Sequence, residues 1–337
     1  MWMTVLKINI LRTGLPALVF LILSSACVTG TKAESIPGGP NILNMKVIPR
    51  ETGPGFYTRT FTVDNRERSY TFYVPSAYTT KEPMPFVLNF HGGGGNSDSQ
   101  RLISRMDQTA DRQGFIVVYP QGTNKKSLLG TGFTWNAGSC CGWAQEHAID
   151  DVKYTNMMLD SLEKELNIDS HRVYATGISN GAMMCYRLAC EMANRIAAIA
   201  PVSGPMGMSA SCTPSRPISI IHFHGTDDQF APYAGGAASK SLPGQKFESV
   251  KNTIAFWQKA LGLQNVKPNI LKKSANVTAE EYHSDKAELV LYTLIGGGHT
   301  WPGGQFGILG EKFLGKMNME ISASETMWEF FKRHSLP

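Results

Sequence analysis

Charged residues are scarce in this sequence and are spread evenly along it. Only 18% of the 337 residues are Asp, Glu, Lys or Arg, and the formal net charge of +5 comes from no basic run and no basic stretch interleaved with aromatics. A nucleic-acid groove needs such clusters of Lys and Arg. The pattern therefore argues against a nucleic-acid partner, and the hydrophobic content of 42% argues against a disordered chain.

Near the N-terminus the sequence has an apolar run, Leu15 to Leu23, that is too short to span a bilayer. Two basic residues precede this run and small residues follow it, which predicts an export signal over residues 1–26. Cys27 comes next, in the position of a lipid anchor, although Ser24 stands where lipoprotein signals usually carry an aliphatic residue. With or without that anchor, we expect a secreted or periplasmic protein.

Cysteine is also sparse, and export would allow disulfides among the five cysteines beyond Cys27: Cys140, Cys141, Cys185, Cys190 and Cys212. Five is odd, so one thiol stays free. Cys185 and Cys190 share a predicted helix and stand more than about 7 Å apart, beyond disulfide reach. Cys190 with Cys212, or either with the adjacent pair, remains open. The pair Cys140-Cys141 has no matching C-x-x-C motif or His cluster elsewhere, so the sequence predicts no metal site.

Apolar runs alternate with amphipathic stretches along most of the chain. After a Gly/Pro-rich leader at 27–54, two alternating segments around a turn at Asp64 and Asn65 predict antiparallel strands at one edge of a sheet. Six continuous apolar runs predict strands that are buried on both faces: 86–90, 115–119, 173–176, 196–202, 218–223 and 289–295. The alternation predicts an α/β fold with a mostly parallel, doubly wound sheet and helices on both faces, in a single domain at 55–337.

The clearest motif is the pentapeptide Gly177-Ile178-Ser179-Asn180-Gly181, which follows one of these strands and opens a helical stretch. In this context G-x-S-x-G predicts a sharp turn that exposes the Ser179 hydroxyl above the sheet as a nucleophile. The flanking glycines are required because a Cβ at either position would collide with the neighbouring strand and helix.

Two further motifs follow predicted strand ends, His224-Gly225-Thr226-Asp227-Asp228 and the glycine-rich loop around His299. The order Ser, Asp, His favours a triad with His299 as general base and Asp228 as the acid that orients it. Asp227 is the competing acid, and we interpret it as capping or solvating the turn. His222 and His224 lack a third metal ligand in sequence, and we interpret them as structural.

A run of glycines, Gly92 to Gly95, follows the predicted strand at 86–90. Neither a P-loop nor a dinucleotide-binding pattern accompanies it, so phosphate binding is not indicated. The run instead predicts an oxyanion hole formed by the backbone N–H groups of Gly93 and Asn180, with Gly94 as the alternative to Gly93.

These motifs together resemble the polyhydroxybutyrate depolymerase family of esterases, which overlaps with carbohydrate esterase family 1, the feruloyl and acetylxylan esterases. The resemblance runs from about Phe56 to near the C-terminus, and it also rests on 119–122, 135–142 and 150–152. It implies an exported serine esterase of the α/β-hydrolase fold, without a cofactor, whose triad is Ser179, Asp228 and His299.

The resemblance implies hydroxyalkanoate esters, or feruloyl or acetyl esters of plant polysaccharide, as substrates. Trp135 and Trp301 are candidates for substrate contact, because amphipathic rings suit stacking on a sugar or phenolic ring. Packing under loops is the alternative role for both, and Asp150 and Asp151 are expected to cap the helix that follows. A serine peptidase of the same fold, or a binding protein on a hydrolase scaffold, is the rival function. The sequence does not indicate the oligomeric state.

Overall fold

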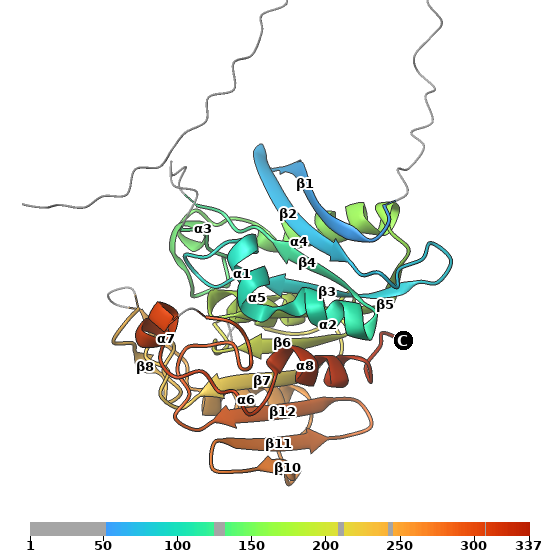
Figure 1. The fold of residues 1–337 in the computed structure, drawn as a ribbon. Helices are drawn as coiled ribbons and strands as arrows, with labels where there is room; N and C mark the ends of the chain where they lie inside the picture. The colour runs from blue at the N-terminus through green and yellow to red at the C-terminus, as the bar shows by residue number, and fades with distance from the viewer. Residues whose placement is uncertain (1–51, 125–131, 208–211, 242–244, 307) are drawn as a thin grey trace, which may run out of the picture. The chain divides into compact units, whose positions relative to one another are not determined.

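Ten strands form one mixed sheet in the computed structural model, which describes residues 52–124, 132–207, 212–241, 245–306 and 308–337 (Figure 1). The order across the sheet is β1-β2-β4-β3-β5-β6-β7-β12-β11-β10. The bounds are β1 Gly55–Val63, β2 Arg66–Val74, β3 Met84–Phe90, β4 Ile116–Pro120, β5 Ile168–Ile178, β6 Ala198–Val202, β7 Ser219–Gly225, β10 Asn269–Lys273, β11 Val277–His283 and β12 Glu288–Leu294.

The described residues belong to one compact unit. The predicted signal at 1–26, Cys27 and most of the predicted leader lie outside the described residues. Among the helices described, none is long and apolar enough to cross a membrane.

Six central strands, from β4 to β12 in the sheet order, run parallel to one another, and antiparallel strands flank them on both sides. The predicted mostly parallel sheet is therefore confirmed. The hairpin of β1 and β2 forms one edge as expected, and its turn residues Asp64 and Asn65 have φ angles of 49° and 60°. Asn and Asp tolerate this left-handed conformation, which matches the twist of a two-residue hairpin.

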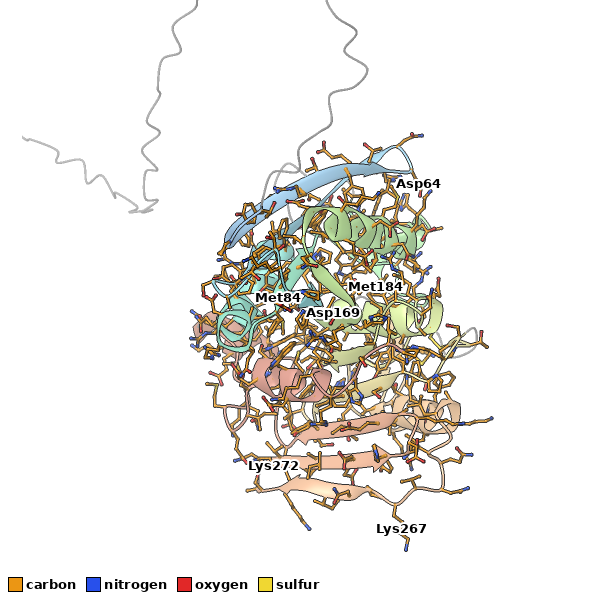
Figure 2. The ribbon with its side chains drawn as sticks, turned by 90° about the vertical axis from the view of Figure 1, so that its right-hand side faces the viewer. Asp64, Met84, Asp169, Met184, Lys267 and Lys272 are labelled. Carbon is orange, nitrogen blue, oxygen red and sulfur yellow. A yellow bond between two sulfur atoms is a disulfide. The ribbon has the colours of Figure 1, made fainter. Side chains whose placement is uncertain are left out.

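Helices cover both faces of the sheet (Figure 1). One face carries α1 Ser97–Ser104, α2 Met106–Gln113 and α8 Ala323–Phe331, and the other carries α4 Asp151–Glu165, α5 Asn180–Glu191 and α6 Val250–Ala260. Alternation along β3 serves both layers, because Phe86 and Leu88 join one core cluster and Val87 the other. Figure 2 shows Met184 inside the molecule and Asp64 and Lys267 at its periphery. The short elements α3 Gly142–Glu146, β8 Gly236–Ala237, β9 Lys246–Phe247 and α7 Ile308–Leu314 lie in the loops.

The far edge of the sheet, β10, was not predicted from the sequence. Its register against β11 shifts between Ile270 and Lys272, and both Ile270 and Leu271 are exposed. A strand with this exposure carries no alternating apolar pattern, so period-2 analysis misses it.

One disulfide joins the end of α5 to the segment before β7, between Cys190 and Cys212. This was one of the open pairings. Cys185 stays a free, buried thiol in α5. It does not pair with Cys190, which is the pairing that their separation along the helix excludes.

The turn between β5 and α5 consists of Ser179 alone, with φ 58° and ψ −121°. Glycines make this turn possible because backbone passes close on each side. A Cβ on Gly177 would lie 2.6 Å from the carbonyl oxygen of Phe90, and one on Gly181 would lie 2.3 Å from the same oxygen. The fold thus leaves no room for a side chain at position 177 or 181.

We predict that Gly181→Ala lowers the free energy of unfolding by about 1–3 kcal/mol, because the new methyl group forces strand β3 and helix α5 apart. Urea unfolding measures the effect. Gly53→Ala is the matched control, since a Cβ there meets nothing within 4 Å. Equal unfolding midpoints for the two variants would contradict the packing described here.

Candidate active site

Ser179 borders a cavity of about 470 Å³ at the carboxyl end of the parallel strands. Its apolar walls come from Met183, Phe230, Phe247 and the disulfide-linked pair Cys140 and Cys141. Polar groups of Thr134, Lys240 and Ser241 also line it. Lys240 Nζ is held 2.9 Å from the carbonyl oxygen of Phe313, at the side where Phe230 lies. The cavity is therefore mostly apolar, with a cation on one side.

Asp228 and His299 lie together in the interior. The Nδ1 atom of His299 is 2.8 Å from Oδ2 of Asp228, and both side chains are buried. A carboxylate only accepts hydrogen bonds, so Nδ1 carries the proton and the lone pair of the neutral ring is on Nε2. This is the tautomer that a general base needs.

The other oxygen of Asp228 accepts two backbone hydrogen bonds, from the N–H groups of Phe230 and Ala231, each at 2.8 Å. Burial by itself would raise the pKa of the Asp228 carboxyl, but the charge on His299 and the hydrogen bonds from His224 and His299 hold that pKa below its usual range. The carboxylate is thus ionised.

Asp227, the competing acid, is exposed and accepts a hydrogen bond from the hydroxyl of Thr226. It faces solvent at the turn, so the geometry favours Asp228 as the partner of His299.

Ser179 borders the cavity and His299 does not, and no hydrogen bond joins the two in the part of the chain that the structure describes. Phe230 connects the two residues: it lines the cavity together with Ser179, and its ring packs on the His299 ring with a centroid separation of 5.1 Å. Catalytic hydrogen bonds in ligand-free enzymes are often long and tighten when substrate binds.

The glycine loop and the start of α5 both reach the cavity. Gly93 and Asn180 line it, and their N–H groups have no acceptor within the described part of the chain. Gly94 N–H, in contrast, donates to the carbonyl oxygen of Phe133 at 2.9 Å. Of the two alternatives, the free donor is therefore Gly93.

His91 holds this loop in place. Its ring is fully buried, with Nδ1 2.8 Å from the carbonyl oxygen of Gly92, while Nε2 accepts a hydrogen bond from Gly122 N–H at 3.0 Å. Burial lowers the pKa of His91 to about 4, so the ring is neutral and bridges the two loops.

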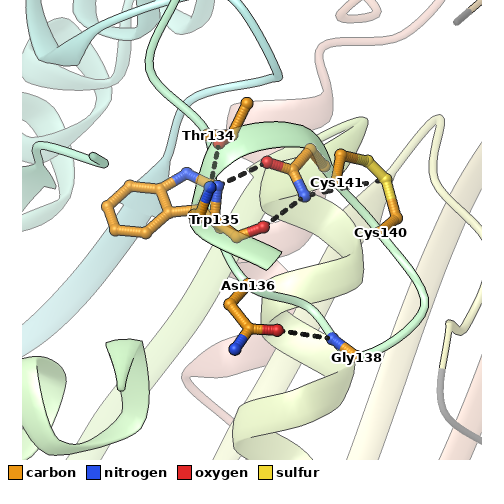
Figure 3. Close-up of a disulfide and its surroundings, with 8 residues drawn as sticks. Thr134, Trp135, Asn136, Gly138, Cys140 and Cys141 are labelled. Atoms are coloured by element: carbon orange, nitrogen blue, oxygen red, sulfur yellow. Dashed lines mark hydrogen bonds between the residues drawn. A yellow bond between two sulfur atoms is a disulfide. The ribbon is translucent and has the colours of Figure 1, made fainter. Parts of the chain in front are cut away.

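Trp135 does not border the cavity. It is fully buried, and its Nε1–H donates to the carbonyl oxygen of His91. The side chain of Asn180 binds both backbone groups of Trp135, its Oδ1 accepting at 2.7 Å and its Nδ2 donating at 3.0 Å. The segment 134–141 is thereby fixed to the turn at Ser179, and its residues Cys140 and Cys141 line the cavity wall. Figure 3 shows Trp135, Cys140 and Cys141 on this segment.

Trp301 is likewise fully buried and donates from Nε1 to the hydroxyl of Ser324 at 3.1 Å. The structure thus places both tryptophans in the packing role that was their alternative. Their rings find apolar neighbours and an acceptor inside the protein, so they have no need of the cavity. The aromatic residues that border the cavity are instead Phe230 and Phe247. One hint of this was present in the sequence, because Phe230 lies two positions after Asp228.

Asp150 caps α4 as expected, accepting from Lys153 N–H at 2.8 Å. Asp151 does not cap. It is fully buried, pairs with Arg68 at 2.7 Å, and accepts from Asn136 N–H at 2.8 Å, so it fixes the start of the segment that leads to Cys140. Within the described residues there is no group of three His, Cys, Asp or Glu that could hold a metal ion.

Comparison with known proteins places these features in one family. The family described as esterase PHB depolymerase matches residues 68–244. Feruloyl esterase B of Piromyces equi is 28% identical over 269 residues, which cover 78% of this chain and 44% of that protein. A bifunctional acetylxylan esterase/xylanase of Neocallimastix patriciarum is 35% identical over 167 residues, 49% of this chain and 22% of that protein. The chain thus spans less than half the length of these two curated relatives.

Among solved structures, the acetyl xylan esterase from Aspergillus awamori superimposes with a TM-score of 0.54 at 18% sequence identity, covering 76% of this chain and 98% of that one. This likeness supports the α/β-hydrolase fold. Because the family match covers more than half of the sequence, this chain belongs to the esterase PHB depolymerase family.

Proposed function

We propose that this protein hydrolyses carboxylic esters by two-step acyl transfer through Ser179, His299 and Asp228. The observation that carries the proposal is the buried, ionised Asp228 bound to Nδ1 of His299, next to a cavity that Ser179 borders on a left-handed turn. Membership of an esterase family supports it independently.

In the first step, Ser179 Oγ attacks the ester carbonyl carbon while Nε2 of His299 takes the hydroxyl proton. The N–H groups of Gly93 and Asn180 donate to the oxyanion, and each such donor contributes about 3 kcal/mol to stabilising the transition state. His299 then protonates the leaving alcohol. Water repeats the attack on the acyl-enzyme and releases the acid.

The apolar walls favour an aromatic acyl group over a small one. Phe230, Phe247 and Met183 supply surface against which a feruloyl ring gains contact, and a volume of about 470 Å³ leaves room for part of the attached sugar. The feruloyl esterase among the relatives supports this choice. Acetyl esters and hydroxyalkanoate oligomers are the other substrates to test.

Export from the cytoplasm is part of the proposal, with or without a lipid on Cys27. The disulfide between Cys190 and Cys212 supports it, because such bonds persist in oxidising compartments.

We predict that a fluorophosphonate probe labels the wild-type protein and not Ser179→Ala, and that this variant loses ester turnover by roughly four to six orders of magnitude. Mass spectrometry of the labelled peptide and an ester assay provide the measurements. A folded wild-type protein that takes no label would favour a binding protein on a hydrolase scaffold. Rapid cleavage of peptides with no ester turnover would favour the peptidase.

We also predict that Phe247→Ala lowers kcat/KM for feruloylated arabinose about tenfold and leaves acetylated xylan nearly unchanged, since only the larger acyl group reaches the ring. Parallel assays that include hydroxybutyrate oligomers measure the preference. Phe56→Ala, on β1, is the control for loss of an aromatic ring elsewhere. Equal losses on the aromatic and acetyl substrates would contradict the assignment of this wall to the acyl group.

A further inference from the structure

Three buried side chains, Tyr186, His222 and His224, form a hydrogen-bonded chain that ends at the carbonyl oxygen of Ala231, beside Asp228. The hydroxyl of Tyr186 on α5 is 2.9 Å from Nδ1 of His222, and Nε2 of His222 is 3.1 Å from Nδ1 of His224 on the same strand, β7. All three are fully buried. Nε2 of His224 lies 2.7 Å from the carbonyl oxygen of Ala231 and 3.4 Å from Oδ2 of Asp228.

The acceptor at the end of the chain determines which atom is the donor in each of its hydrogen bonds. A carbonyl oxygen cannot donate, so Nε2 of His224 carries a hydrogen. With His224 neutral, its Nδ1 accepts from Nε2–H of His222, and Nδ1 of His222 accepts from the hydroxyl of Tyr186. Burial, and then the neighbouring His224, lower the pKa of His222 well below its usual value, which agrees with a neutral ring.

His224 holds Asp228 by two routes. First, His224 donates to the carbonyl oxygen of Ala231, and the N–H of Ala231 donates to Oδ1 of Asp228. Second, Nε2 of His224 lies near Oδ2 of Asp228, the oxygen that accepts from His299. The turn from 228 to 231 is therefore fixed from both ends. A mobile carboxylate would lose the alignment that keeps the lone pair of His299 pointed at the nucleophile.

Other titratable groups lie around the chain. Tyr233 packs edge-on against His224, and Cys185 precedes Tyr186 on α5. Burial raises the pKa of the Cys185 thiol and of the Tyr186 phenol. The thiol and the phenol are therefore uncharged, and Asp228 is the ionised carboxylate beside which the chain ends.

We propose that His224, oriented by His222 and Tyr186, is a positioning residue for the acid of the triad. The proposal rests on the proposed function, since it assigns His224 a role only if Asp228 serves His299 in catalysis. It goes beyond the interpretation of His222 and His224 as structural packing, because packing alone requires neither a fixed tautomer nor contact with the carboxylate.

We predict that His224→Phe lowers kcat about tenfold to a hundredfold, the effect of losing one hydrogen bond near a charged acceptor, with KM unchanged because His224 does not line the cavity. The acid limb of the kcat/KM profile should move to higher pH. Without the His224 donor, the Asp228 carboxylate attracts protons more strongly and favours the protonated form of His299. His224→Gln, which can supply an N–H near the position of Nε2, should recover most of the activity.

Tyr186→Phe tests the same chain without touching β7, and should show a smaller shift in the same direction. Tyr174→Phe is its matched control, since Tyr174 is a buried tyrosine that donates to the carbonyl oxygen of His334, away from the site. If His224→Phe does not fold, His224→Gln and Tyr186→Phe against Tyr174→Phe carry the test.

Wild-type kinetics and probe labelling of Ser179 are measured first, so that failure of the proposed function is recognised separately. If the wild type is labelled and active, then pH profiles for Tyr186→Phe and both His224 variants that match the profile of Tyr174→Phe would overturn the positioning role. A displaced acid limb in His224→Phe or Tyr186→Phe, with KM unchanged, would support it.

Discussion

A carboxylate removed from water must find its hydrogen-bond donors inside the protein, and much of this site is organised around meeting that demand at Asp228. Two backbone N–H groups donate to one oxygen, Nδ1 of His299 lies 2.8 Å from the other, and Nε2 of His224 approaches that second oxygen at 3.4 Å. Because an unpaired buried charge costs several kcal/mol, these donors need to be in place together. The need links β7, the turn that follows it and the loop of His299 into one unit.

The side of the site that holds Ser179 depends on a different constraint, the close approach of backbone segments. Glycines at 177 and 181 let β3 pass the turn, and the side chain of Asn180 fastens that turn to Trp135. Neutral His91 then bridges the loops that carry Gly92 and Gly122. Buried hydrogen bonds thus fix both the segment around Ser179 and the turn at Asp228. The cavity is therefore largely shaped before a substrate arrives.

The sequence was sufficient for those features whose signal is local. Apolar runs predicted the parallel strands. Motifs at strand ends predicted that Asp228 and His299 are partners, which the structure brings to 2.8 Å, and that Ser179 lies at the turn before α5. It was insufficient where the outcome depends on distant partners. Whether Trp135 faces a ligand or the core depends on the carbonyl of His91, 44 positions away. Asp151 is a cap by position and an ion-pair partner by contact with Arg68. No spacing rule reveals that Tyr186 reaches His222.

The exposed strand β10 has a consequence for how this protein behaves in a crowded solution. An unpaired outer strand with Ile270 and Leu271 in contact with water is a template on which another chain can extend the sheet. Here the register of β10 against β11 is irregular after Ile270, which interrupts the row of free amides, and Lys273 brings positive charge to the same strand. A second copy docking there would meet broken pairing and mutual repulsion, so this margin can stay bare without starting aggregation.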